Sequence, residues 1–317
     1  MHSCGSYFVP VPKEALMNVK RLFVVTVALQ LMVFATGGWA QEWHNLVEQA
    51  GVNGSVNWTS GIIQAVGTGA PPEEAYGKPN ARPMALRAAQ LDAYRNLLEI
   101  VKGVRINSET LVEDFMVKTD VIKSQVEGMV KGAQVVKKEY LSDGSVEVTV
   151  HMSLNGGFAQ LVLPAEIQQV EKVRPIQEVG KTPPPQPVEP LAPETQAVAP
   201  TPEAVIYTGL VIDARGIEAR PAMSPKIVDE TGREVYGSAY VSREFAVQQG
   251  MTGYAKDLTA AQQNTRVTND PLTIKGLKTE GPGKSDIVVS DADAGKVLSS
   301  SENLSFLQKC RVMIVLD

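Results

Sequence analysis

A proline-rich stretch divides this chain of 317 residues and limits what the chain can fold into. Nine of the 20 prolines lie between Arg174 and Glu203, a segment without aromatic residues. Such a segment cannot bury enough apolar surface to form a core, and its proline density favours an extended backbone. We therefore predict two folded domains joined by a proline-rich linker over residues 165–203. The linker composition is equally typical of a spacer and of a connection that binds nothing.

A largely apolar run near the N-terminus predicts export. Lys20 and Arg21 precede this run, which covers residues 22–35 and is shorter than the roughly 20 residues that a membrane-spanning helix needs. Small residues follow, and they favour signal-peptide cleavage between Ala40 and Gln41. We expect a signal peptide over residues 1–40 with its true start at Met17, an N-terminal tail over residues 41–53, and no transmembrane segment in the mature chain.

Charge and cysteine content narrow the function further. The formal net charge is −5, whereas proteins that coat nucleic acid or anionic membranes carry a basic surface. We therefore expect no nucleic-acid partner. Only Cys310 follows the predicted cleavage site, so the mature chain can form no internal disulfide and lacks the cysteine to which a lipid would be attached. Cys310 opens an apolar run to Leu316, which predicts a buried thiol.

The first domain, residues 54–164, shows mixed α and β periodicity. Asp143-Gly144 separates two alternating runs and is a strong signal for a β-hairpin. An alanine-rich helix is predicted between Asn80 and Gly103, with an alanine face that allows close packing on a sheet. The predicted order is β-α-β-α-β-β: a strand from residue 56 into the Gly67–Pro72 loop, the helix, a strand over 104–112, a helix over 115–130, and the hairpin over 133–154.

The second domain, residues 204–317, also mixes strands and helices. A turn at Asp229–Gly232 predicts a hairpin, and the region 240–264 is partly helical in pattern. Further strands are expected over 204–212, 271–277, 287–289 and 310–316. The fold class is therefore α/β in the broad sense (α+β), with two small mixed domains that contain antiparallel hairpins.

Two glycine- or aspartate-rich motifs resemble ligand loops without meeting their requirements. Gly281–Ser285 resembles a phosphate loop, but the first required glycine is Lys278 and a strand rather than a helix follows, so we interpret it as a turn between strands. The segment from Asp291 to Glu302 resembles a calcium loop, but Lys296 occupies the position of the required glycine. Ser290 with Asp293 is more typical of a helix cap.

Catalytic chemistry has little support in the sequence. Only His44 and His151 remain after the predicted cleavage, and no common hydrolase, zinc or redox motif occurs. We expect no enzymatic activity, no cofactor and no metal, although two carboxylates can meet in space without any sequence signature. Asp213 and Arg215, at the end of a predicted strand, are the one candidate binding loop, because arginine can clamp a carboxylate or phosphate. The alternative is a salt bridge beside a turn.

The first domain resembles the family of small envelope lipoproteins that includes flagellar proteins P and T. The resemblance covers about 100 residues near 54–160 and is a pattern of spacings: Trp58 with Gly67 and Gly69, a helix opening at Ala81-Arg82, alternation from Val104 to Thr110, Gly132-Ala133, and Tyr140 before Asp143-Gly144. It implies a small α/β domain that packs into assemblies around the outer membrane, in some members the periplasmic rings of the flagellar motor, without enzymatic activity. The resemblance transfers no functional residue, and the lipid-bearing cysteine is missing.

These observations favour a non-catalytic structural or assembly protein of the bacterial cell envelope, and the resemblance implies an association with the flagellum. Its expected location is the periplasm, peripheral to the outer membrane. Its expected partners are envelope or flagellar basal-body proteins or further copies of itself, through the open edge of a first-domain strand or the turns around Gly67–Pro72. The alternatives are a periplasmic solute- or polysaccharide-binding protein that uses the 213–216 and 281–286 loops, and an unrecognised carboxylate hydrolase.

Overall fold

Two mixed α/β lobes, each built on its own sheet, make up the folded part of the chain. The computed structural model describes residues 45–165, 167, 207–299 and 301–317. We call residues 45–167 the first lobe and residues 207–317 the second lobe. The predicted fold class is confirmed, since both lobes combine helices with sheets that contain antiparallel hairpins. The predicted signal peptide, its cleavage site and nearly all of the proline-rich linker lie outside the described residues.

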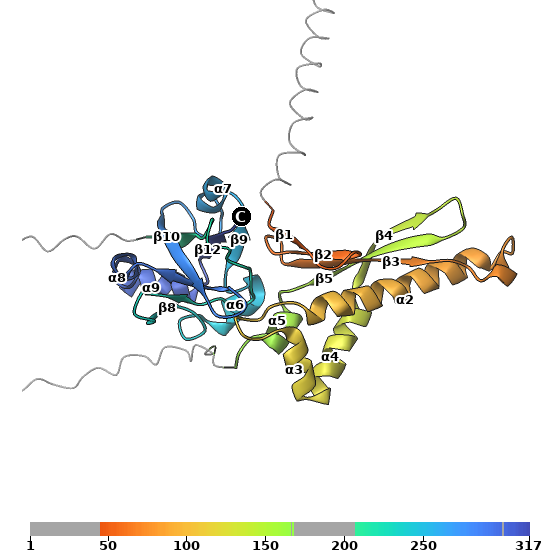
Figure 1. Cartoon of the computed structure of the whole chain (residues 1–317), viewed down its shortest axis with the longest axis horizontal. Coiled ribbons are helices and arrows are strands. Elements are labelled where there is room, and N and C mark those ends of the chain that lie inside the picture. Colours follow the sequence, from red (N-terminus) through yellow and green to blue (C-terminus); the bar gives the residue numbers. More distant parts are fainter. Residues whose placement is uncertain (1–44, 166, 168–206, 300) are drawn as a thin grey trace, which may run out of the picture. The chain divides into compact units, whose positions relative to one another are not determined.

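The first lobe is an antiparallel sheet of five strands in the order β1-β2-β3-β5-β4. A long helix, α2, runs along the sheet, and α3 and α4 form a helical hairpin that projects from it (Figure 1). The elements are β1 (Val47–Gln49), β2 (Gly54–Asn57), β3 (Ile62–Gly69), a 3-10 turn (Glu73–Ala75), α2 (Ala81–Lys102), α3 (Val112–Lys118), α4 (Asp120–Lys131), β4 (Gln134–Tyr140), β5 (Val146–Ser153) and α5 (Gly157–Val162).

Helix α2 packs very closely on strand β3 because both surfaces are made of small residues. Ala85, Ala89 and Ala93 are fully buried on the sheet side of the helix. A Cβ atom on Gly67 would overlap the backbone of Ala93, and one on Gly69 would overlap the helix backbone near Ala89. The predicted alanine-mediated approach of helix and sheet is confirmed. Gly67 is buried beneath α2, so it is not part of an exposed contact turn.

Local differences from the predicted first-domain order have clear causes. The run from residue 56 is a hairpin, β2–β3, that turns at Trp58–Gly61, and Gly61 has a φ of +66°.

The single helix expected over 115–130 is divided at Thr119, which is extended and accepts a hydrogen bond from the Ile122 amide at the start of α4. The predicted tail contains β1, which pairs with β2. The predicted hairpin at Asp143-Gly144 is confirmed as β4–β5.

The strand expected over residues 104–112 does not form. The segment folds back on itself, since the Asn107 side chain accepts hydrogen bonds from the Glu109 and Thr110 amides and only Arg105 and Leu111 form an isolated bridge. Its outward backbone groups bond to the second lobe instead of to the first-lobe sheet. The alternating apolar residues of 104–112 therefore mark a segment that is buried between the two lobes. They do not mark a strand of the first-lobe sheet.

The second lobe is a sheet of seven strands in the order β8-β7-β11-β10-β6-β12-β9. Strand β6 lies inside the sheet and pairs in parallel with β10 and β12, whereas β10–β11 and β7–β8 are antiparallel hairpins. The elements are β6 (Gly209–Asp213), β7 (Ile227–Val228), β8 (Glu234–Tyr236), α6 (Arg243–Gln249), β9 (Gly253–Ala255), α7 (Leu258–Gln262), β10 (Pro271–Glu280), β11 (Asp286–Val289), α8 (Asp291–Leu298), α9 (Ser301–Gln308) and β12 (Val312–Val315). The predicted β7–β8 hairpin and the partly helical region after residue 240 are confirmed.

Backbone hydrogen bonds join the two lobes into one compact unit over Asn45–Asp317. The amides of Met223 and Ser224 donate to the carbonyls of Arg105 and Ile106, at 3.0 and 2.7 Å. The Arg105 side chain donates to Glu48 in the first lobe and to the Pro221 carbonyl in the second. A core of buried apolar residues runs through both lobes. No helix within the described residues is both long and apolar enough to cross a membrane.

Candidate functional site

The candidate binding loop at the end of β6 forms an internal salt bridge. The Arg215 guanidinium donates two hydrogen bonds to the Asp213 carboxylate, at 2.7 and 2.8 Å. The hydrogen bonds from Arg215 hold the pKa of Asp213 below its ordinary value. Nearby, the Gly216 amide donates to the Asp317 carboxylate. The Arg215 guanidinium, which could bind a ligand anion, is therefore already paired within the loop. This arrangement favours a salt bridge beside a turn over a binding loop.

The Gly281–Ser285 segment is a turn between β10 and β11, as predicted, and it contacts the first lobe. The Gly283 amide donates to the Ser108 carbonyl at 2.7 Å, and the Ser108 hydroxyl donates to the Glu280 carbonyl at 2.9 Å. A Cβ on Gly283 would lie 2.7 Å from that same Ser108 oxygen. Lys284 pairs with Glu218. The two glycines thus permit the close approach of Ser108, and the lysine is used in an ion pair.

Ser290 caps helix α8, as its spacing from Asp293 predicts. The Ser290 hydroxyl accepts a hydrogen bond from the Asp293 amide at 3.1 Å, and the Asp293 carboxylate pairs with Lys296 at 2.7 Å. Asp291 accepts a bond from the Glu230 amide on the neighbouring β7–β8 turn. Across the described ranges, no group of three or more His, Cys, Asp or Glu side chains is arranged to hold a metal ion.

The remaining single residues of interest are buried or paired. Cys310 is a buried free cysteine, as predicted, and burial raises the pKa of its thiol to about 11. His151 Nε2 lies 2.9 Å from the Gln64 side-chain oxygen on the adjacent strand, and partial burial lowers its pKa. At neutral pH the thiol is therefore protonated and the imidazole is neutral. His44, Ala40 and Gln41 lie outside the described residues.

An exposed apolar and aromatic cluster lies at the end of the β4–β5 hairpin. We call this cluster the hairpin patch, and its members are Tyr76, Met84, Tyr140 and Leu141, which are 43–55% exposed. Strand register brings their segments to one end of the sheet: Tyr140 and Gly69 both lie opposite Val146, so β4 and β3 end at the same level. Tyr76, in the loop after β3, lies beside Gly144 of the β4–β5 turn, where an added Cβ would be 3.7 Å from its ring. The guanidinium of Arg82, at the start of α2, lies 6.0 Å from the Tyr140 ring centre.

Strand β4 adds an open sheet edge beside the hairpin patch. It is the last strand in the order of the first-lobe sheet, and nearly all of its residues are exposed. Its pairing with β5 is interrupted between Val135 and Lys137, and Lys137 and Lys138 follow. Lysines and irregular pairing are common protections of an edge strand against random pairing, but they leave its backbone groups available to a complementary strand.

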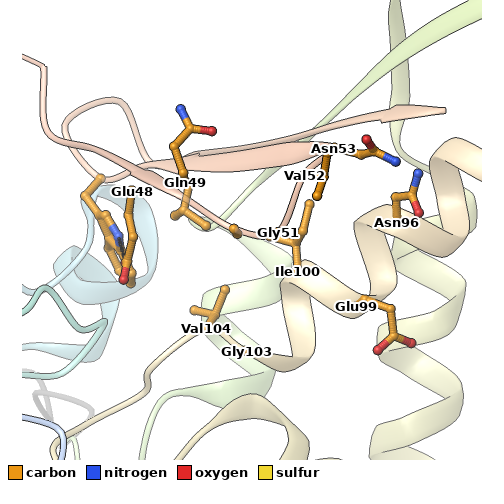
Figure 2. A pocket seen from close by; sticks show the side chains of 13 residues that line it. Glu48, Gln49, Gly51, Val52, Asn53, Asn96, Glu99, Ile100, Gly103 and Val104 are labelled. Carbon is orange, nitrogen blue, oxygen red and sulfur yellow. Dashed lines mark hydrogen bonds between the residues drawn. The ribbon is translucent and has the colours of Figure 1, made fainter.

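A groove lies between the β1–β2 turn and the C-terminal part of α2 (Figure 2). Its volume is about 490 Å³. Asn53 and Asn96 lie together at one end and Glu48 lies at the other (Figure 2). The main charged group is already bonded, since the Glu48 carboxylate accepts hydrogen bonds from Arg105 and from the indole N–H of Trp58 at 2.9 Å. The groove therefore presents mainly amide groups above an apolar floor.

A smaller cavity lies between the two lobes, and we call it the lobe cavity. Its volume is about 270 Å³. Trp58 and Asn155 contribute from the first lobe, and Thr252, Tyr254 and Arg266 contribute from the second. Trp58 and Tyr254 contact each other edge to face, with ring centres 5.8 Å apart. No local sequence pattern could reveal this cavity, because its walls are separated by about 100 residues and a proline-rich segment.

One similarity to a known protein family emerges. Residues 209–317 match the family model for the second domain of Treponema pallidum Tp0624. The matched region begins at β6 and covers nearly all of the described second lobe. The search of curated proteins gives no match for the chain.

Proposed function

We propose that this protein is an exported, non-catalytic component of the bacterial cell envelope that works by assembling with other envelope proteins. The observation that carries this proposal is the hairpin patch beside the open edge of β4. Aromatic and methionine side chains are enriched at protein interfaces, and an open edge strand can accept a strand of a partner. Both features lie at one end of the first-lobe sheet, so a single partner can engage them together.

Two sequence features support the location and class of partner. The charged and apolar leader favours export to the periplasm, and the spacing pattern of the first domain resembles that of small envelope lipoproteins, including flagellar proteins P and T. The first assembly to test is therefore the flagellar basal body, followed by other complexes at the periplasmic side of the outer membrane and by self-assembly of this chain.

The test is co-purification from the native host. The full chain carries a C-terminal tag, the envelope is fractionated, and complexes are isolated with and without cross-linking. We expect the wild-type protein to sediment with a large envelope complex, and the double substitution Tyr140→Ser with Leu141→Ser to reduce that recovery at least tenfold. Loss of a central aromatic anchor at an interface typically costs about 2 kcal/mol or more.

A matched control separates the hairpin patch from apolar exposure in general. Val117 and Val121, on the α3–α4 hairpin, are 82% and 66% exposed. The double substitution Val117→Ser with Val121→Ser should leave co-sedimentation unchanged. A wild-type protein that is recovered only as a free monomer would refute the assembly role, and equal losses in both double variants would refute the assignment to the hairpin patch.

A further inference from the structure

The lobe cavity carries one unbalanced positive charge. Arg266 is its only charged lining residue among those described, and neither Asp nor Glu contributes to its wall. Arg266 forms no ion pair with any residue of the described ranges. Its guanidinium donates instead to three backbone carbonyls, those of Gln249, Gly250 and Cys310. These bonds hold the group in place but leave its full charge uncompensated.

The guanidinium also has bonding capacity to spare. An arginine side chain has five N–H groups, remains protonated at neutral pH, and matches a carboxylate with two parallel bonds. Three bonds to carbonyls leave two N–H groups of Arg266 without an acceptor in the described part of the chain. The half-buried guanidinium, with free donors, favours an anion, because a charge that is partly removed from water is stabilised by a partner charge.

Two neutral polar groups in the same cavity also lack partners. The Thr252 hydroxyl is buried, with the residue 8% exposed; it neighbours the Tyr254 hydroxyl and makes no hydrogen bond of regular geometry. The side-chain amide of Asn155 lies between Gly61 and Gly250 and donates and accepts no hydrogen bond among the described residues. Neighbouring hydroxyls are used: Thr59 donates to the Tyr254 carbonyl, and the Tyr254 hydroxyl donates to the Ala222 carbonyl. Buried polar groups are normally bonded, so the Thr252 hydroxyl indicates a missing partner, and the half-buried Asn155 amide has donors and an acceptor to spare beside it.

We propose that the lobe cavity is a binding site for a small carboxylate that bears a second polar group, such as a short hydroxy acid. Arg266 would pair with the carboxylate, while Thr252 and Asn155 would bond to the hydroxyl or to the second carboxylate oxygen. The cavity volume is at the small end of the range for ligand pockets, which excludes an oligosaccharide or a long chain. This site differs from the 213–216 and 281–286 loops, and it does not depend on the proposed assembly role.

The test is ligand-dependent thermal stability of the protein purified from cells that express the full chain. The probes are sodium lactate and sodium glycerate, with lactamide as the neutral analogue and sodium phosphate and sodium sulfate as other anions. We expect lactate or glycerate to raise the midpoint of thermal unfolding by about 5 °C at a hundredfold excess over Kd. Calorimetric titration then gives the affinity.

Two variants and one control test whether binding depends on the polar groups of the lobe cavity. Thr252→Val has nearly the same shape and removes only the unpaired hydroxyl, so it should fold normally and weaken binding about tenfold. Thr68→Val, at an exposed position of β3 and outside the cavity, should bind like the wild type. Arg266→Lys should abolish binding, with circular dichroism to confirm that it folds. No stabilisation by either hydroxy acid, equal stabilisation by lactamide, stabilisation by phosphate or sulfate alone, or unchanged affinity in Thr252→Val would each overturn the proposal.

Discussion

At the residue scale, most ion pairs of the described residues join near neighbours in the sequence. Asp213 pairs with Arg215, Asp293 with Lys296, and Glu99 with Lys102. Such pairs lie within or at the ends of single strands and helices. Because their side chains are partly exposed, each pair stabilises the fold only modestly. Arg266 is the contrasting case, since it is held by carbonyls from three different residues and has no carboxylate partner in the described ranges. Arg266 therefore differs from these residues in having only backbone carbonyls as hydrogen-bond partners among the described residues.

The salt bridge at the end of β6 predicts a specific pH dependence. The pKa of Asp213 is lowered below its ordinary 3.8, so its carboxylate stabilises the folded protein above that pH and loses this effect as pH falls through the lowered pKa. Asp213→Asn should lower the free energy of unfolding at pH 7 by less than about 1 kcal/mol, because the pair is partly exposed. Thermal unfolding measured from pH 7 to pH 2 should show this difference shrinking in the acid range.

The control for this measurement is Asp270→Asn. Asp270 is exposed, and its carboxylate makes no hydrogen bond among the described residues, so its substitution should change stability little at any pH. A difference between Asp213→Asn and the wild type that persisted undiminished at pH 2 would show that the ion pair is not its source.

At the element scale, the close contact of α2 with β3 organises the first lobe. Small residues on both elements remove the usual spacing between helix and sheet, and the backbones of Gly67 and Ala93 come into direct contact. The resulting helix–sheet layer carries the β4–β5 hairpin at one side and holds the start of α2 next to Tyr140. The hairpin patch therefore combines residues of regular elements, Met84 in α2 and Tyr140 in β4, with Tyr76 and Leu141 in the adjoining turns.

Substitution at this contact should be costly. Gly67→Ala places a methyl group in the backbone of α2, so the helix must move away from the sheet, and we expect a loss of about 2–3 kcal/mol in the free energy of unfolding. Gly128→Ala, in α4, is the matched control: a Cβ there meets nothing within 4 Å. That helix position should gain up to about 1 kcal/mol from the better helix propensity of alanine. Urea denaturation of both variants distinguishes the two cases, and equal stabilities would contradict the packing argument.

At the scale of the whole molecule, the segment that connects α2 to α3 joins the two lobes. Carbonyls of Arg105, Ile106 and Ser108 accept hydrogen bonds from second-lobe amides, and Ser108 is almost completely buried between the lobes. The two lobes are separated in the chain by a proline-rich segment. They are held together by the α2–α3 connection of the first lobe and by the Gly281–Ser285 turn of the second. The lobe cavity exists only because of this packing.

The glycine turn gives a test of how tightly the lobes are joined. Gly283 does not have a positive φ, so alanine is compatible with its backbone, but the added methyl would press on the Ser108 carbonyl. We expect Gly283→Ala to destabilise the folded unit by about 1–3 kcal/mol and to speed proteolytic cleavage between residues 104 and 112. Cleavage sites are identified by mass spectrometry under native conditions.

Gly295→Ala serves as the control, because a Cβ at that position in α8 meets nothing within 4 Å. Its cleavage pattern should match that of the wild type. If Gly283→Ala also cleaved like the wild type, the Ser108 contact would not hold the lobes together in solution.

The sequence by itself determined the features that depend on near neighbours along the chain. These are the α/β class of both lobes, the boundaries of α2, the Asp143-Gly144 hairpin, the Ser290 cap and the burial of Cys310. Each follows from turn conformation, capping or periodicity, which act over a few residues. Where a tertiary contact competed, the sequence misled, as in residues 104–112, whose apolar alternation serves the lobe interface rather than the sheet.

Only the tertiary structure decided which residues form a surface or a cavity. Strand register and the loop after β3 bring Tyr76 and Tyr140 to the same end of the first-lobe sheet, and Arg266 remains without a counter-charge because of what surrounds it in space. The glycines of the 281–285 turn have a similar explanation, since their partner Ser108 is more than 170 residues away in the chain. Local patterns specify how the backbone runs, but exposure, charge balance and long-range contact depend on packing between segments that the sequence does not place side by side.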